Sequence, residues 1–377
     1  MNQVIRASSD EDFSKMGLED FLFRNTNYQT MVDGTTLGLE KITLESVKSH
    51  YRDFFSSANL TIGIAGNYPP KFTARLQEAM QKLPQKNKEI PAITKVASPD
   101  GINVEIIAKE NAMGSAIFMG FPLPVTRTDD EFAALMVANS WLGEHRKSYS
   151  RLYQKIREAR SMNYGDYSYI EWYENGGQNM LPPPGVPRSN NYFSIWIRPV
   201  QTGESLRKQY SELAEIKTGH AHFAIRMALR EMQMLIDNGL TDEDFELTKK
   251  FLLSYMKLYI QTPSRQLGYL MDSKFYGRKD YIAEMQTLLQ KLSLDDVNNA
   301  IKKYWQTQRM FITIVTDDSE ATPLYSSLMN NEKSPMSYSD QLKSTLPPEL
   351  LREDEAVSGY SLNIRKVSIV KAAEMFR

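Results

Sequence analysis

The sequence of 377 residues has no cysteine, only four histidines and almost no net charge. The lack of cysteine excludes disulfides, thiolate metal sites and cysteine nucleophiles. With 45 basic and 46 acidic residues, the formal charge of −1 leaves no field that would attract nucleic acid or an anionic membrane surface. No run of about 18 apolar residues occurs, so no membrane-spanning helix is expected.

The rest of the composition is that of an ordinary globular protein, with 41% hydrophobic and 24% charged residues. At ~150 residues per domain, the length indicates two or three domains. Hydrophobic periodicity predicts amphipathic helices at about 10–24, 43–55 and 70–82, and a strand at 60–66. Further along, alternation and capping residues predict strands near 102–109, 114–121, 164–174, 191–200 and 310–315, helices at about 129–144, 149–160 and through 205–306, and a last apolar run at 367–370.

A short pattern recurs at an offset of 250 residues. The segment Ile42–Val47 resembles Leu292–Val297, each with a Thr or Ser in position to cap the helix that follows. At the same offset and without a gap, an aromatic pair and a strand follow: Phe54-Phe55 aligns with Tyr304-Trp305, and Leu60, Ile62 and Ile64 align with Met310, Ile312 and Ile314. The recurrence of a capped helix, an aromatic pair and an in-register strand predicts a tandem duplication.

The duplication has unequal halves. About 190 residues separate Gly101 from Leu292, whereas 41 residues precede Ile42, so about 149 residues of the first copy are expected to be missing upstream of Met1. We therefore predict four parts: a C-terminal remnant of a first domain (1–83), a polar, Pro-containing linker (84–101), a complete second domain (102–318) and a C-terminal extension (319–377).

The repeated signature from Ile42 to Gly66 resembles the end of the first domain of insulinase/pitrilysin-type (M16) zinc peptidases, in their bacterial M16B-like form. A second stretch, 150–164, reads SRLYQKIREARSMNY and resembles the family's second-domain motif, in which an Arg is followed seven residues later by a Tyr. The tail from Pro335 to Phe376 resembles the tail of bacterial members. The resemblance covers essentially the whole chain.

This resemblance implies an α+β fold of tandem M16-type domains, each an antiparallel sheet with helices packed on one face, here with the first domain incomplete. Active family members carry His-x-x-Glu-His in the first domain, where two His and a downstream Glu hold Zn²⁺. His50, His145, His220 and His222 are the complete set in this chain, and none lies in that motif. We therefore expect no metal site, no cofactor and no complete catalytic site in this chain, and no peptide hydrolysis by the chain alone.

Arg157 and Tyr164 are the candidate substrate-binding residues that the resemblance implies. Both can donate hydrogen bonds to peptide carbonyls, and both are expected at one edge of the chamber that encloses the substrate. The alternative is that Arg157 pairs with a surface acid and Tyr164 caps the core. Ser161 stands where the family usually has Gly, which is a departure from the pattern.

Other polar residues have less distinctive contexts. His220 and His222 stand at the head of a long helix, where residues two apart diverge, so we expect capping and packing rather than metal binding. Glu11 and Glu19 are available near the position of the family's third zinc ligand, but neither can be assigned to it. The Pro-rich loop 174–185 is expected to be a connector, with a chamber-rim or partner contact as the alternative.

Three functions stay open. The chain is the substrate-binding part of a zinc peptidase whose catalytic portion lies outside it, or a non-catalytic subunit that supplies the Arg and Tyr to a zinc-bearing M16 partner, or a scaffold, either purely structural or peptide-binding. The first two imply a peptide or unfolded-polypeptide substrate and a homo- or hetero-oligomer with an M16 protein. An incomplete first domain exposes an apolar face, so self-association or docking onto the second domain is expected.

Overall fold

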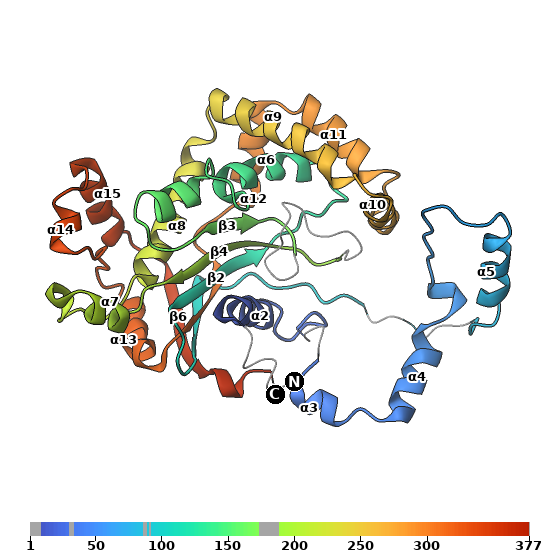
Figure 1. Ribbon diagram of the computed structural model, residues 1–377, viewed down its shortest axis with the longest axis horizontal. Helices are drawn as coiled ribbons and strands as arrows, with labels where there is room; N and C mark the ends of the chain where they lie inside the picture. The colour runs from blue at the N-terminus through green and yellow to red at the C-terminus, as the bar shows by residue number, and fades with distance from the viewer. Residues whose placement is uncertain (1–8, 30–33, 86–88, 90–91, 173–187, 377) are drawn as a thin grey trace.

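Six strands form a single sheet in the computed structural model, which describes residues 9–29, 34–85, 89, 92–172 and 188–376 (Figure 1). Their order across the sheet is β3-β4-β2-β5-β1-β6. The strands are β1 (Ile102–Ala108), β2 (Ser115–Pro122), β3 (Asp166–Tyr169), β4 (Tyr192–Val200), β5 (Met310–Thr316) and β6 (Ile364–Lys371). Apart from a shorter β3, these are the strands predicted in the second domain and the tail.

The sheet is mixed. The neighbours β3–β4, β4–β2 and β2–β5 are antiparallel, whereas β1 pairs in parallel with both β5 and β6. The α+β class is confirmed. The expected antiparallel pairing is found among β3, β4, β2 and β5, whereas the pairs that β1 makes with β5 and β6 are parallel. The edge strand β6 comes from the C-terminal tail, so the tail completes the sheet.

Helices account for most of the remaining described residues. They are α2 (Asp10–Leu22), α3 (Thr36–Glu40), α4 (Leu44–Phe54), α5 (Phe72–Met80), α6 (Phe132–Gly143), α7 (Gly203–Gln209), α8 (Ala221–Asn238), α9 (Asp242–Tyr259), α10 (Pro263–Phe275), α11 (Tyr281–Lys291), α12 (Leu294–Tyr304), α13 (Asp318–Met329), α14 (Asp340–Lys343) and α15 (Pro348–Ser358). Within the described part of the chain, none of them combines the length and apolar character needed to cross a bilayer.

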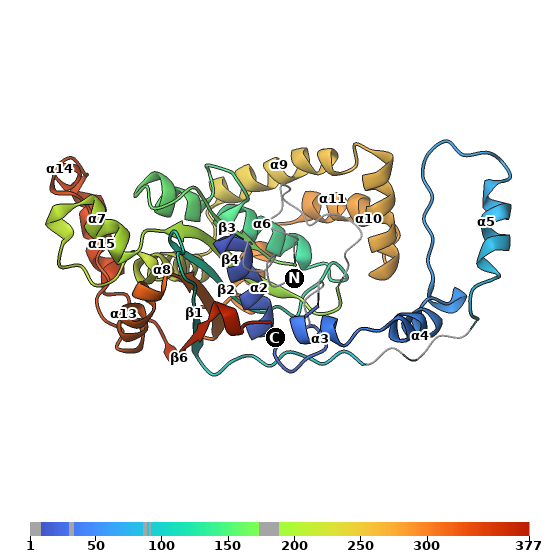
Figure 2. The ribbon, with the colours of Figure 1, turned by 60° about the horizontal axis from the view of Figure 1, so that its bottom comes forward.

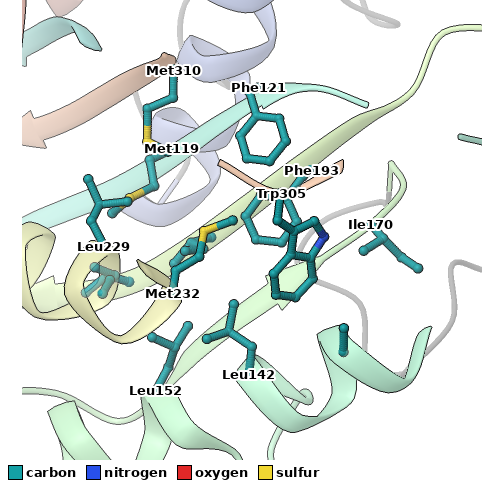
Figure 3. Packing of buried hydrophobic residues seen from close by; sticks show 14 of the residues in the cluster. Met119, Phe121, Leu142, Leu152, Ile170, Phe193, Leu229, Met232, Trp305 and Met310 are labelled. Carbon is teal, nitrogen blue, oxygen red and sulfur yellow. The ribbon is translucent and has the colours of Figure 1, made fainter. Parts of the chain in front are cut away.

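One face of the sheet packs against α6, α8 and α12 to form the main core (Figures 1 and 3). Met119 and Phe193 project from the sheet toward Leu229 of α8 and Leu142 of α6, and Trp305 closes the same cluster. All of these side chains are buried. The dominant stabilisation of the fold therefore comes from apolar burial between this helical layer and the sheet.

The opposite face of the sheet is covered by α2. Leu18 and Leu22 of this helix pack against Phe118 and Trp196 of the sheet. The hydroxyl of Ser14 donates to the carbonyl oxygen of Ala116 on β2 at 3.1 Å, which fixes the helix on the strand. A helix from the N-terminal segment thus belongs to the same packed body as residues 102–371, while the predicted domain boundaries stay a prediction.

The internal repeat is visible in the helices α4 and α12, whose bounds differ by 250 residues at both ends. Each helix begins with a capping box, formed by Thr43 and Ser46 in α4 and by Ser293 and Asp296 in α12. The local sequence therefore specifies the same capped helix twice. Figures 1 and 2 show α4 and α5 extending away from the sheet, whereas α12 lies on it.

The strand predicted at 60–66 is wrong. In the described residues this stretch pairs with no strand, although its counterpart β5 lies between β1 and β2. The reason is physical: a strand is stabilised by its neighbours rather than by its own alternation. The prediction at 164–174 holds for β3. Residues 173 and 174, like the whole loop 174–185, lie outside the described residues.

Gly17 lets α2 approach the sheet closely, because a Cβ at this position would lie 2.6 Å from Cδ1 of Ile107. Gly17→Ala should gain about 1 kcal/mol of helix propensity and lose part of it to this contact. We expect the substitution to be more favourable by roughly 1 kcal/mol in an Ile107→Val background, which removes the Cδ1 atom. A double-mutant cycle of urea unfolding measures the coupling, and additive effects would contradict the close packing.

Candidate functional site

A groove of about 670 Å³ lies where the 153–164 segment meets the end of β4 and the C-terminal tail. Arg157 and Tyr164 both line it, so the two residues selected from the sequence share one site. Tyr210 and Tyr338 line it as well, the first after α7 and the second just before α14. The groove is therefore built from three stretches that are distant in the sequence.

Arg157 projects from a π-helical turn, Tyr153–Glu158, in which the amide of Ala159 donates to the carbonyl oxygen of Gln154 at 2.9 Å. Its guanidinium lies 4.8 Å from the ring centre of Tyr153 and donates a hydrogen bond to the hydroxyl of that residue. Such π-turns are often found at functional sites because they re-aim side chains. Arg157 is thus held against Tyr153 while it lines the groove.

Ser161 ends this helix in the left-handed region, at φ 52°. Its amide donates to the carbonyl oxygen of Arg157 at 2.7 Å, as expected for a residue just past a helix C-terminus. Glycine adopts this conformation without steric cost, which accounts for the Gly implied by the sequence resemblance and makes Ser161 a conformationally costly substitute. Ser161 nevertheless adopts the left-handed conformation that suits Gly, so the serine does not prevent this turn of the backbone.

Asn163 fixes the turn that presents Tyr164. Its side-chain amide donates to Asp166 at 2.8 Å and to the carbonyl oxygen of Arg198 at 3.0 Å, while its oxygen accepts from the amide of Gly165. Tyr164 lies at the tip and is 78% exposed, so its hydroxyl is free to reach a ligand. This exposure rules out the alternative in which Tyr164 caps the core.

Asp166 lies at the base of the same turn and is fully buried. Burial raises the pKa of this carboxyl well above its ordinary value, against the lowering effects of the Asn163 hydrogen bond and the charges of Arg198 and Arg157. The carboxyl is thereby shifted toward its protonated form.

Arg160 attaches the motif helix to the C-terminal tail. Its buried guanidinium donates to Asp354 at 2.7 Å and to Glu353 at 2.8 Å, both on α15. Lys155 adds a second ion pair to Glu353 at 2.5 Å, and the hydroxyl of Tyr338 donates to Asp354 at 2.7 Å. These bonds determine the spacing between the two walls of the groove.

The family described as "Peptidase M16 inactive domain" matches residues 41–195. A Helicobacter pylori protein named non-peptidase homolog YmxG is 22% identical over 325 residues, covering 83% of this chain and 65% of that protein. The chain is therefore similar to members of the M16 peptidase family. Its match with the family's inactive-domain type and with a non-peptidase homologue supports an inactive M16-related chain.

Further M16 relatives agree with this assignment. The probable inactive metalloprotease YmfF of Bacillus subtilis is 24% identical over 262 residues, covering 64% of this chain and 60% of that protein. The crystal structure of a peptidase M16 inactive domain from Pseudomonas fluorescens has the same fold, with a TM-score of 0.65 and 17% identity, over 84% of this chain and 69% of that one. The chain spans less than two thirds of the length of these two curated relatives.

The zinc of active M16 members does not fit the residues present in this chain. In the described ranges, no three His, Asp or Glu side chains gather in a way that could hold a metal ion. His145 and His222 are buried and hydrogen-bonded through Nδ1, to the hydroxyls of Tyr169 at 2.6 Å and Ser327 at 2.9 Å.

The other candidate ligands hold the fold together. Glu11 forms an ion pair with Arg198 at 2.9 Å, and Glu19 accepts a hydrogen bond from the hydroxyl of Tyr192 at 2.7 Å. Both carboxylates therefore tie α2 to β4. His50 lies exposed on α4, where its ring contacts the aromatic side chains at the end of the same helix.

Sequence reasoning missed the contributions of His220, Tyr210 and Tyr338 to the groove. His220 is buried at the head of α8, and its Nε2 accepts a 3.4 Å hydrogen bond from the amide of Ser337 in the tail. No periodic pattern marks the tail stretch around Tyr338. Only the covalent order of the elements and the acidic residues of α15 could have hinted that the tail returns to the motif.

Arg160→Gln should destabilise the chain by about 3–5 kcal/mol, because it leaves the buried carboxylate of Asp354 without its cation. The matched control is Lys333→Gln, which removes an exposed 2.7 Å ion pair to Glu355 on the same helix and should cost less than about 1 kcal/mol. Urea unfolding measures both values. Equal, small effects would show that the Arg160 pairs do not hold the tail.

His220 should make stability depend on acidity. Burial lowers its pKa from 6.5 to about 4, so the unfolded chain takes up this proton at higher pH than the folded chain does. The unfolding free energy should therefore fall as pH decreases from 6.5 to 4, and His220→Asn should reduce that slope by up to about 1.4 kcal/mol per pH unit. Urea unfolding across this range tests the change, and a slope that His220→Asn leaves unchanged would contradict it.

Proposed function

We propose that this chain is the substrate-binding, non-catalytic half of an M16 peptidase system, in which the groove holds an extended segment of a peptide or unfolded polypeptide. The observation that carries the proposal is the convergence of Arg157 and Tyr164 on one groove from opposite ends of a single, tightly anchored turn. Neither side chain is needed to complete the core, since Arg157 is partly exposed and Tyr164 is largely exposed.

The chemistry suits main-chain recognition. The Arg157 guanidinium and the Tyr164 hydroxyl are both donors, and an extended peptide presents carbonyl oxygens at regular intervals. Donors that bind carbonyl oxygens act on any sequence, which is what a binding site for varied unfolded polypeptides requires. The role of these residues in the reaction is to bind and orient the peptide.

Zinc and the groups that activate water are proposed to come from outside this chain. The sequence contains no His-x-x-Glu-His, and two of its relatives are named non-peptidase homolog and probable inactive metalloprotease. These names support a non-catalytic member that works beside a zinc-bearing M16 part. The same groove serves whether that part belongs to a longer polypeptide or to a separate subunit.

Arg157→Ala should weaken the binding of fluorescein-labelled β-casein, an unfolded polypeptide, by about tenfold, because a hydrogen bond from a charged donor is lost. Tyr164→Phe, which removes only the hydroxyl, should weaken binding by a smaller factor. Fluorescence anisotropy measures the dissociation constants. Both variants should unfold at the wild-type temperature, since neither residue holds the core.

The matched control is Arg365→Ala, which removes an Arg side chain that is 71% exposed on β6, away from the groove. It should bind β-casein as the wild type does. A purely structural scaffold is the competing interpretation, and it predicts no measurable affinity in any of these proteins. Equal affinity of the wild type, Arg157→Ala and Arg365→Ala would refute the assignment of the groove.

A further inference from the structure

The segment 151–160 carries four cations, and they differ in their partners. Three of them form ion pairs with carboxylates, at 2.6, 2.5 and 2.7 Å respectively: Arg151 with Glu231, Lys155 with Glu353 and Arg160 with Asp354. Arg157 is the fourth. Within the described part of the chain, no carboxylate oxygen lies within 4.0 Å of a nitrogen of its guanidinium. The cation that lines the groove is thus the one that its own segment leaves without an anion.

The Arg157 side chain is nevertheless held in place. Its guanidinium lies 4.8 Å from the ring centre of Tyr153 and donates a hydrogen bond to the hydroxyl of the same residue. That is the one hydrogen bond that this guanidinium makes to the residues that the structure describes, although the group carries five N–H donors. A planar fork that is already oriented loses less entropy when it binds a ligand.

Other donors around the groove are also unused. The hydroxyls of Tyr164 and Tyr210 make no hydrogen bond within the described residues, and the two side chains come from different stretches of the chain. Among the described residues that line the groove, Glu158 is the one acid, and its side chain is exposed. The groove therefore offers a ligand one unpaired cation and two hydroxyl groups.

A carboxylate matches these groups better than a neutral carbonyl does. A carboxylate has two oxygens and only accepts hydrogen bonds, so it can take both arms of a guanidinium and a hydroxyl at the same time. Bonds between a guanidinium and a carboxylate are charge-assisted and about twice as strong as neutral ones. A carboxylate would also give Arg157 the partner that the three other cations of its segment already have.

We propose that Arg157 binds a carboxylate of the peptide in the groove, either the terminal one or that of an Asp or Glu side chain, so that the groove selects acidic segments over neutral ones. This inference rests on the proposed function and names the class of substrate. The negative charge of Glu158 borders the same groove and opposes the preference.

The test titrates three unlabelled, N-acetylated nonapeptides of Gly, Ser, Ala and Gln into the full chain by isothermal titration calorimetry. The first has a central Asn and a free C-terminus, the second a central Asp and a C-terminal amide, and the third a central Asn and a C-terminal amide. We expect the third to bind at least tenfold more weakly than the tighter of the other two, because it lacks a charged acceptor. The tighter peptide identifies the source of the carboxylate.

Arg157→Gln keeps N–H donors for a carbonyl oxygen but removes the charge, so it should reduce the preference for the carboxylate peptide to within twofold. Glu158→Gln should raise the affinity for that peptide by roughly twofold, because it removes an exposed negative charge. The matched control is Arg365→Gln, which makes the same charge change at a 71% exposed position on β6, away from the groove. This variant should keep the full preference.

Equal affinities of the wild type for the three peptides would overturn the carboxylate assignment, and so would a preference that persists in Arg157→Gln. Absence of binding by all three peptides to a chain that binds β-casein would overturn it as well. In each of these cases the proposed function still stands if the binding of β-casein depends on Arg157. Loss of that dependence would refute the proposed function instead, so the two failures are distinguishable.

Discussion

The buried ion pairs of Arg160 are the interaction on which the groove depends. A guanidinium with no exposed side-chain surface requires partners, and Asp354 and Glu353 of α15 provide them. The same residue donates to the carbonyl oxygen of Lys155, so it also ties down the turn before Arg157. One side chain thus sets both the shape of the motif helix and its distance from the tail.

A second buried cation explains why α15 is in the right place to receive Arg160. Arg226 of α8 donates to the carbonyl oxygens of Glu332 and Ser358, which follow α13 and end α15, and to the side chain of Asn331. Carbonyl groups at helix C-termini carry partial negative charge, so two helix ends converge on one guanidinium. Burial lowers the pKa of Arg226 to about 10, which leaves it charged near neutral pH and able to hold the tail in position.

The sequence predicted local structure well, because local structure has local causes. The capping boxes at Thr43 and Ser293 were readable, and the helices that follow them begin where the caps place them. The sharing of one site by Arg157 and Tyr164 was also predictable, since one short motif carries both. The third wall of the groove was not predictable from the sequence. Tyr338 is held there by its hydrogen bond to Asp354, and Asp354 in turn pairs with Arg160, almost 200 positions away.

The two copies of the repeat show where such reasoning stops. Leu60 and Ile62 have the same alternation as Met310 and Ile312, yet only the second pair lies in a sheet. Alternation determines which side of a strand is apolar, but hydrogen bonds to neighbouring strands determine whether the strand exists. The prediction at 60–66 was therefore correct about the alternation of apolar side chains and wrong about the backbone, which pairs with no neighbouring strand in the described residues. In the described residues, what separates the two copies is whether neighbouring strands flank the segment, as β1 and β2 flank β5.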